Sequence, residues 1–331
     1  MAFRAAFVAS LAIRYNRSDT EMKFIFLDET GRVRSGWRAG AFFVTFLVFA
    51  LCLIVGAMAI LTLLPIGPTA GSYVPVVIPF AISAVLAIVF GWLYGRLFEG
   101  LPYRALGCSF GGGWLGHFAL GCAVGAVALA SAVIVAVMSG GISLTINRDS
   151  TGSAVSATLA ATFIIFLVGA LSEETLFRGY VLQTFVRSKV APTGIVLTSL
   201  LFAFAHNANP DVGKLALANT FIAGIWFALA YMKTRDLWFP LGMHFMWNWL
   251  QGPVFGINVS GIAEFSPDPV LRATDAGPAW LTGGTYGIEG GAACTFALLI
   301  SLAVIYFLPN PTPDYEVLAL NQPPSTEPET K

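Results

Sequence analysis

The sequence predicts an all-α membrane protein, a polytopic helical bundle with about eight transmembrane helices. Hydrophobic residues make up 56% of the 331-residue chain and charged residues only 11%, whereas soluble domains carry roughly a quarter charged residues. Two long stretches, 39–95 and 105–147, contain no Asp, Glu, Lys or Arg. A water-soluble fold needs more charged surface than this. The 18 basic and 18 acidic residues balance, which excludes the basic excess that a nucleic-acid partner requires.

Eight apolar segments are candidates for these helices, because a membrane-spanning helix needs about 20 apolar residues. The lengths of the segments and their glycines favour helices over barrel strands, which would alternate apolar and polar residues. The fourth segment carries charges, and the fifth and seventh are short and must borrow flanking residues. The candidates are Ala39–Leu64, Val74–Gly95, Trp114–Met138, Ala154–Phe185, Thr193–His206, Leu215–Met232, Leu237–Leu250 and Ala292–Leu308.

The basic residues of the connecting segments predict the orientation of the bundle, because cytoplasmic loops are enriched in Lys and Arg. Alternate loops hold only Arg148, Lys214 and Arg272. The other side holds the remaining fifteen, namely Arg4, Arg14, Arg17, Lys23, Arg32, Arg34, Arg38, Arg96, Arg104, Arg178, Arg187, Lys189, Lys233, Arg235 and Lys331. We therefore expect a multi-pass integral membrane protein in the lipid bilayer with both termini in the cytoplasm.

The chain divides into three parts at this level. Residues 1–38 are predicted to be a cytoplasmic N-terminal segment, and residues 39–308 an eight-helix membrane domain. Residues 309–331 contain six prolines and several acidic residues, a composition typical of a disordered tail. Within the membrane domain, the Gly- and Pro-rich stretch 251–291 is either a cap over the non-cytoplasmic side or a long connection.

Ionisable residues inside the fourth span are the first functional candidates, because each costs roughly 2.5–3.5 kcal/mol in a membrane helix. Glu174 and Arg178 are four residues apart and can pair on one helix face. Glu173 is rotated by about 100° from Glu174 and lacks that partner. The alternative is that these residues mark the cytoplasmic end of the helix, but apolar residues resume after Arg178. Glu173 then lies about 21 Å inside the helix, measured from Arg187.

Two further polar motifs lie in the following spans. His206 follows Phe202 by four residues and lies about 20 Å from the start of its span, a depth that matches Glu173. His244 and Asn248 are also four apart and share a helix face, although such a pair can also serve helix association. His117 has no partner at useful spacing, so we expect it to be interfacial or packed. The catalytic motifs therefore fall within 154–251.

These side chains supply the groups that peptide-bond hydrolysis requires. Glu or His can take a proton from water, and His and Asn can donate to the oxyanion that forms. The sequence has no HExxH zinc helix and no Asp pair in its spans. A single GxSxG string at 107–111 lies in a Gly-rich loop with no preceding strand, so the nucleophile-elbow context is missing. The four cysteines lack metal-ligand spacing and are expected to pack as apolar residues.

The three motifs, in this order, resemble the CPBP family. This family contains the CAAX-processing type II prenyl endopeptidases and bacterial relatives linked to bacteriocin processing and lysostaphin resistance. The motifs are EExxxR (Glu173, Glu174, Arg178), FxxxH (Phe202, His206) and HxxxN (His244, Asn248). The resemblance implies an intramembrane endopeptidase in which Glu173 and His206 activate water and His244 and Asn248 form the oxyanion hole. Glu174 and Arg178 would brace the site.

The resemblance leaves the cofactor, the activity and the substrate open. No cofactor is expected to be required, but Glu173, His206 and His244 could hold a divalent metal such as zinc. The expected partner is a membrane-associated protein or peptide, of the CAAX type or another. The alternative function is a catalytically silent scaffold or bacteriocin-immunity protein that keeps the polar cluster for helix association. A transporter is disfavoured because no inverted repeat is evident.

Overall fold

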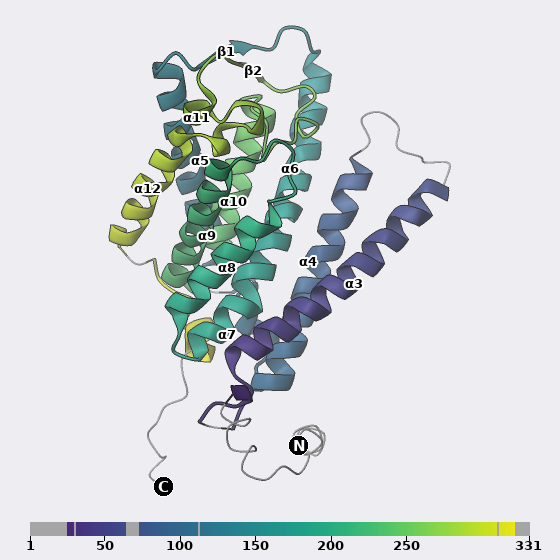
Figure 1. Ribbon diagram of the computed structural model, residues 1–331, viewed down its shortest axis with the longest axis vertical. Coiled ribbons are helices and arrows are strands. Elements are labelled where there is room, and N and C mark those ends of the chain that lie inside the picture. Colours follow the sequence, from purple (N-terminus) through teal and green to yellow (C-terminus); the bar gives the residue numbers. More distant parts are fainter. Residues whose placement is uncertain (1–24, 30, 64–72, 112, 310, 322–331) are drawn as a thin grey trace.

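The computed structural model describes residues 25–29, 31–63, 73–111, 113–309 and 311–321. Most of this chain forms a helical bundle, and α3 diverges from the bundle towards its far end (Figure 1). The predicted all-α membrane bundle is confirmed. The helices are α3 (Ser35–Leu63), α4 (Val74–Tyr94), α5 (Trp114–Met138), α6 (Gly152–Glu174), α7 (Leu182–Arg187), α8 (Ala191–Ala205), α9 (Lys214–Thr234), α10 (Trp238–Trp249), α11 (Ala279–Thr282), α12 (Ala292–Phe307) and α13 (Tyr315–Leu320).

Each of the eight predicted spans coincides with a helical segment. Five of these segments in the described residues are long and apolar enough to cross a membrane, namely Ser35–Leu63, Val74–Glu99, Trp114–Met138, Gly152–Arg187 and Lys214–Thr234. The helices α8 and α12 are shorter apolar helices, and α10 has only 12 residues. Most of α10 is buried inside the protein, so it contacts other helices rather than lipid and need not be apolar over a full span.

The fourth span is not one regular helix. The chain leaves α6 at Glu174, continues as a π-helical segment, Thr175–Val181, and resumes α-helical geometry in α7. Gly179 departs from helical geometry with φ −67° and ψ −118°. Such π-helical turns inside α-helices occur frequently at functional sites. The break lies directly after the two glutamates and contains Arg178.

Glycines set the position of α10 against α5. A Cβ atom on Gly121 would lie 2.2 Å from the Phe239 carbonyl oxygen, and one on Gly125 would lie 2.4 Å from that of Met243. On the opposite helix, a Cβ atom on Gly242 would lie 2.3 Å from the Phe118 carbonyl oxygen. A larger residue at any of these positions would overlap the backbone of the facing helix. Small residues allow membrane helices to approach this closely. This contact fixes the helix that carries His244 and Asn248.

A cap covers one end of the bundle, and it includes the only two strands assigned in the described residues. Strand β1 (Ile142–Ile146) pairs antiparallel with β2 (Leu271–Asp275), with Ile142 opposite Asp275. The cap also contains α11 and lies above α5, α9 and α10 (Figure 1). The stretch 251–291 is therefore a folded cap rather than a simple connection.

The opposite end of the bundle corrects one prediction. Residues 311–321 were expected to be disordered, but they contain α13 and pack against the bundle. Asp314 caps α13 by accepting from the backbone N–H groups of Glu316 and Val317, and Val317 is 1% exposed. The proline content did not predict α13, because tertiary contacts, rather than local sequence propensity, stabilise so short a helix. Residues 322–331 of the predicted tail and most of the predicted N-terminal segment lie outside the described residues.

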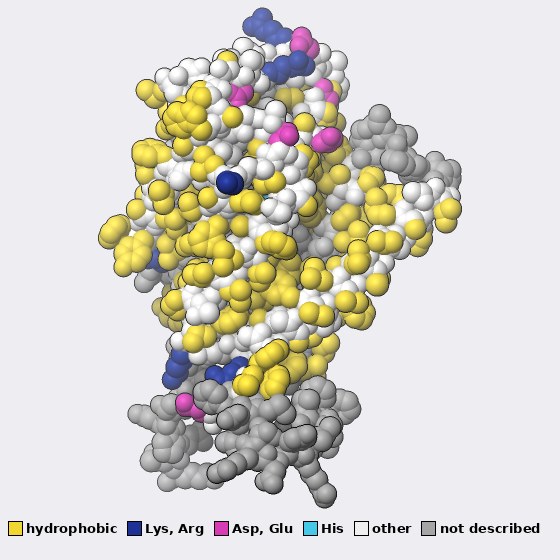
Figure 2. Space-filling model, in the orientation of Figure 1, with side chains coloured by type: hydrophobic (Ala, Val, Ile, Leu, Met, Phe, Trp, Pro, Cys, Tyr) yellow, Lys and Arg dark blue, Asp and Glu magenta, His cyan; other side chains and the backbone are white. Residues whose placement is uncertain are grey.

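The surface is that of a protein surrounded by lipid. Apolar side chains spread over the middle of the visible face, and the charged side chains lie mostly towards its two ends (Figure 2). Exposed large apolar residues are frequent on the outer helices, among them Leu47 on α3, Val85 on α4 and Phe296 on α12. Exposed apolar surface of this extent marks contact with another apolar phase. The chain is an integral membrane protein.

Candidate active site

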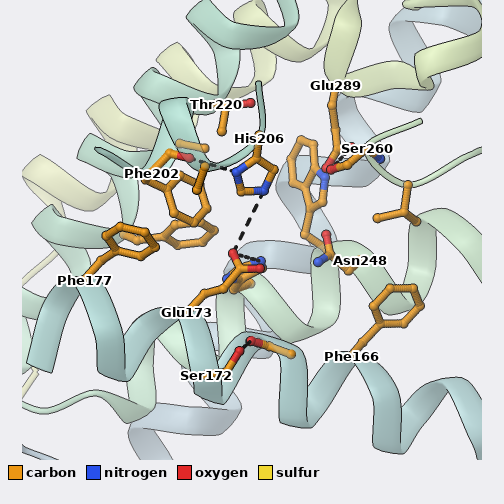
Figure 3. Close-up of a pocket in the computed structure, with 18 of the residues that line it drawn as sticks. Phe166, Ser172, Glu173, Phe177, Phe202, His206, Thr220, Asn248, Ser260 and Glu289 are labelled. Atoms are coloured by element: carbon orange, nitrogen blue, oxygen red, sulfur yellow. Dashed lines mark hydrogen bonds and ion pairs between the residues drawn. The ribbon is translucent and has the colours of Figure 1, made fainter. Parts of the chain in front are cut away.

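Three predicted site residues from three helices meet at one point. Glu173 lies in the last turn of α6, His206 directly follows α8, and His244 lies in the middle of α10. The Glu173 Oε2 atom is 4.0 Å from His206 Nε2 and 3.9 Å from His244 Nε2. All three side chains line a cavity of about 330 Å³, into which Glu173 and His206 point (Figure 3).

Each histidine is anchored through its other ring nitrogen. His206 Nδ1 lies 2.8 Å from the Phe202 carbonyl oxygen. Because a carbonyl only accepts, Nδ1 must carry the proton there, and this orients Nε2 towards Glu173. His244 Nδ1 lies 2.9 Å from Glu174 Oε1, which orients its Nε2 towards the same carboxylate. The gaps of 3.9–4.0 Å to Glu173 exceed a direct hydrogen bond and suit a bridging water.

Glu174 and Arg178 form the predicted ion pair, and the structure adds a third member to it. Arg178 Nη1 donates to Glu174 Oε1 over 3.1 Å, and both side chains are 0% exposed. The same oxygen accepts from His244 Nδ1. Sequence spacing could reveal the pair four residues apart but not this contact, because His244 comes from a helix 70 residues later. Glu174 therefore holds both the arginine and the ring of His244.

Aromatic rings enclose the Arg178 guanidinium. Its Cζ atom lies 4.6 Å from the ring centroid of Phe202 and 5.1 Å from that of Phe227, within the range of cation–π attraction. Arg178 Nη2 also donates to the Gly224 carbonyl oxygen over 3.0 Å. Phe202 thus supports both Arg178 and, through its carbonyl, His206. Sequence reasoning missed Phe227, which also stacks on the His244 ring with centroids 4.8 Å apart.

Asn248 lies one helical turn beyond His244 on α10 and lines the same cavity. Within the described part of the chain, its amide makes no hydrogen bond to another residue. Figure 3 shows the amide directed into the cavity on the side away from Phe202. Asn248 is therefore an available donor in the cavity that Glu173 also lines.

The cap closes the cavity with residues that sequence reasoning did not single out. Glu289 and Ser260 line it from this side, and Figure 3 shows them entering opposite Ser172. Glu289 Oε2 accepts from the Ser260 backbone N–H over 2.6 Å and from its hydroxyl over 3.0 Å. Burial, with the nearby charge of Glu289, raises the pKa of Tyr286 to about 12. The only sequence signal was one acidic residue in the glycine-rich run 283–291, which does not distinguish a site from a loop.

The described residues contain no group of three or more His, Cys, Asp or Glu side chains arranged to hold a metal ion. Glu173, His206 and His244 come nearest to such an arrangement. Their donor atoms are separated by 3.9–4.0 Å, whereas ligands about 2.0–2.2 Å from a tetrahedral zinc lie closer to one another.

Comparison with known proteins bears on the same segment. Residues 155–250 match the model of a family described as "Type II CAAX prenyl endopeptidase Rce1-like". This segment is therefore similar to the Rce1-like family. It contains Glu173, Glu174, Arg178, Phe202, His206, His244 and Asn248. The family resemblance inferred from the three motifs is thereby confirmed.

A relative of the Rce1-like segment comes from Escherichia coli, an "Uncharacterized 24.3 kDa protein". It is 39% identical over 83 residues, which cover 24% of this chain and 37% of the relative. The match thus spans little more than a third of the relative. The Rce1-like family supports a CAAX-type intramembrane protease in general terms.

Proposed function

We propose that the chain is an intramembrane endopeptidase that hydrolyses a peptide bond of a membrane-associated substrate with a water molecule activated by Glu173. The observation that carries the proposal is the convergence of Glu173, His206 and His244 on one cavity, with separations of 3.9–4.0 Å that a water can bridge. The family match supports the reaction class, and the apolar cavity walls support a membrane-associated peptide. The CAAX type is the substrate that the family name suggests.

The first step of the proposed mechanism uses the carboxylate and His206. The Glu173 carboxylate accepts a proton from the water, and the resulting hydroxide attacks the carbonyl carbon of the substrate. His206, with its Nδ1–H donated to Phe202, presents the Nε2 lone pair to the second hydrogen of the water. This contact aims the water oxygen at the carbonyl carbon.

The second step stabilises the tetrahedral oxyanion and releases the amine. Asn248 donates an amide N–H to the oxyanion. His244 donates Nε2–H in its doubly protonated form, since its Nδ1–H is already bonded to Glu174. Protonated Glu173 then gives its proton to the amide nitrogen, and the C–N bond breaks. With His244 charged, the cations of Arg178 and His244 balance the two glutamates, which favours a buried cluster.

Glu174 and Arg178 position the machinery in this proposal without touching the substrate. Glu174 holds the His244 ring, and Arg178 neutralises Glu174. We also propose that both termini face the cytoplasm, because fifteen of the eighteen Lys and Arg residues fall on that side of the predicted topology. The proposal is supported by the start of α3 and residues 311–321 lying at the same end of the bundle, where Arg187 contacts both Glu99 and Asn321. Reporter fusions at the C-terminal tail and within 251–291 should then mark opposite sides of the membrane.

A hydrolysis assay tests the proposal. The full chain, purified into lipid nanodiscs, is mixed with solubilised membrane proteins from its source cells, and new amino termini are identified by mass spectrometry. The same is done with Glu173→Gln. We expect a small set of termini that only the wild type produces. If wild type and Glu173→Gln produce the same termini, the proposed function is wrong, and the silent-scaffold alternative replaces it.

A further inference from the structure

The cavity contains a second carboxylate whose role the proposed mechanism does not explain. Among the described residues that line the cavity, Glu173 and Glu289 carry the acidic side chains and there is no Lys or Arg. Arg178 does not line it and is already paired with Glu174. The cavity thus has a catalytic carboxylate on α6 and another carboxylate on the cap.

Glu289 is held in place by the cap and by α9. Ser260 donates two hydrogen bonds to the Glu289 carboxylate, both to Oε2. Its backbone carbonyl accepts from Asn219 Nδ2 over 2.8 Å, and the same amide donates to the Gly291 carbonyl over 2.9 Å. In the part of the chain that the structure describes, no Lys, Arg or His pairs with the Glu289 carboxylate. The group is therefore oriented but not neutralised.

An oriented carboxylate without a counter-charge attracts a cation, and the attraction grows when water is excluded from an apolar cavity. On the cap side, the cavity lining includes the apolar residues Val259, Ile262 and Phe265 next to the polar Ser260. Such walls suit the methylene stem of a lysine or arginine while its charged end reaches the carboxylate. A neutral or acidic side chain would leave Glu289 uncompensated in this position.

We propose that Glu289 is a specificity-determining residue that binds a lysine or arginine side chain of the peptide substrate. This inference rests on the proposed function and adds the chemistry of one substrate position. A peptide bound along the cavity would place its basic side chain at the cap while the scissile bond lies between Glu173 and Asn248. The enzyme would then cut at a fixed distance from a basic residue.

The other role for Glu289 is purely structural, as an acceptor that ties down Ser260. The two roles respond differently to Glu289→Gln. The glutamine side-chain oxygen can still accept both hydrogen bonds from Ser260, but the side chain has no charge. A structural role predicts that the substitution leaves substrate preference unchanged. A role in recognition predicts that the preference for basic side chains is lost.

The experiment compares cut sites in a randomised peptide library, using wild type, Glu289→Gln and the control Glu264→Gln in nanodiscs. Glu264 is an exposed acid of the same cap that does not line the cavity. In wild type and in the control, we expect Lys or Arg at one position from the scissile bond to be enriched about tenfold or more, as a charged hydrogen bond allows. In Glu289→Gln this enrichment should fall to about twofold or less. Equal enrichment in Glu289→Gln and wild type overturns the inference, as does no enrichment in wild type.

A binding measurement separates this inference from the proposed hydrolysis. An acetylated leucine–lysine–leucine amide and its norleucine analogue are titrated against each protein, with Glu173→Gln as a further control. We expect the lysine peptide to bind wild type and Glu173→Gln about tenfold more tightly than the analogue, and Glu289→Gln without preference. If the preference disappears in Glu173→Gln but remains in Glu289→Gln, the cation binds at Glu173 and the inference is wrong. If the Glu289-dependent preference is present but no library peptide is cut, the proposed hydrolysis fails and the cation site stands.

Discussion

Two buried ionic clusters in this protein can be compared, one at the cavity and one at the end of the bundle opposite the cap. In the latter, Glu99 accepts from Arg38 over 2.8 Å and from Arg187 through two hydrogen bonds of 2.9 and 2.6 Å. Both Glu99 oxygens are thus bonded to guanidinium groups. In the cavity cluster, Glu173 Oε2 and Glu174 Oε2 are buried without a hydrogen-bond partner.

The difference shows that burial of charge by itself does not indicate chemistry. The Glu99 cluster joins α3, α7 and the segment after α4. Guanidinium groups hold both oxygens of this carboxylate, and Glu99 does not line the cavity. The cavity cluster keeps an unpaired carboxylate oxygen facing two histidines and an open volume of about 330 Å³. In the proposed mechanism, the reacting groups are the ones whose polar atoms are incompletely paired, and such buried unpaired groups need an explanation because they are costly.

His117 offers a second case of the same kind. It was expected to be interfacial or packed without a partner at helical spacing, and it is buried with Nδ1 bonded to Asp236 and Nε2 to the Thr312 carbonyl over 3.0 Å. Ser109, the serine of the GxSxG string, bonds to neither ring nitrogen of His117. Both nitrogens are occupied, so His117 ties α5 to the segment before α10 and to residues 311–321 rather than serving as a base.

The largest expected effect sharpens the comparison at Glu173. Glu173→Gln keeps the size of the side chain but removes the proton acceptor, so turnover should fall by about 10²–10⁴-fold. Thermal stability should remain close to that of wild type, because Glu173 is 25% exposed and is not held by an ion pair of normal length. Turnover numbers and melting curves on the same preparation check this. Wild-type turnover in Glu173→Gln would contradict the mechanism.

Glu99→Gln should show the opposite pattern. It leaves Arg38 and Arg187 buried without their counter-charge, which should lower the free energy of unfolding by about 3–5 kcal/mol. The rate per folded molecule should stay unchanged, because Glu99 does not line the cavity. Denaturation measured beside turnover decides the point. A stable but inactive Glu99→Gln would show that the comparison between the clusters is mistaken.

Asn248→Ala tests the donor side of the cavity cluster. Loss of one oxyanion donor should reduce turnover by about 10²–10³-fold, with little change in KM because the interaction forms in the transition state. Steady-state kinetics separates the two parameters. An increase in KM at constant turnover would assign Asn248 to substrate binding instead.

Gly125→Ala tests how the α5–α10 contact supports the site. The added methyl group would lie 2.4 Å from the Met243 carbonyl oxygen, so we expect a loss of about 1–3 kcal/mol from overpacking. Gly116→Ala on the same helix is the matched control, since nothing lies within 4 Å of its Cβ position. The control should be neutral or slightly stabilising, as helix propensity favours alanine by about 1 kcal/mol. Equal melting temperatures for the two variants would contradict the close packing.

The smallest expected effect concerns metal removal. The proposed mechanism routes no step through a metal, so incubation with a zinc chelator should leave turnover within about twofold, which is under 0.5 kcal/mol of activation free energy. The control is the same protein after zinc is added back. Loss of activity that zinc restores would assign Glu173, His206 and His244 to a metal site and change the role of the carboxylate.

The sequence by itself determined the class of the protein and the helical elements. Long segments without charged residues cannot form a water-soluble fold. An i, i+4 spacing places Glu174 beside Arg178 in any helix. The same local arithmetic put Glu173 and His206 at equal depth. Each of these inferences depends on geometry within one helix, which a sequence pattern contains.

The tertiary structure alone decided what lies between helices. The bond from His244 to Glu174, the aromatic enclosure of Arg178, the fold of the cap and the position of Glu289 depend on how separate segments pack. The order in residues 311–321 has the same origin, because Val317 is buried against other parts of the chain. Contacts distant in sequence leave no periodic signal in one chain. Packing at close-approach glycines, rather than local propensity, set the position of α10, which carries His244, against α5.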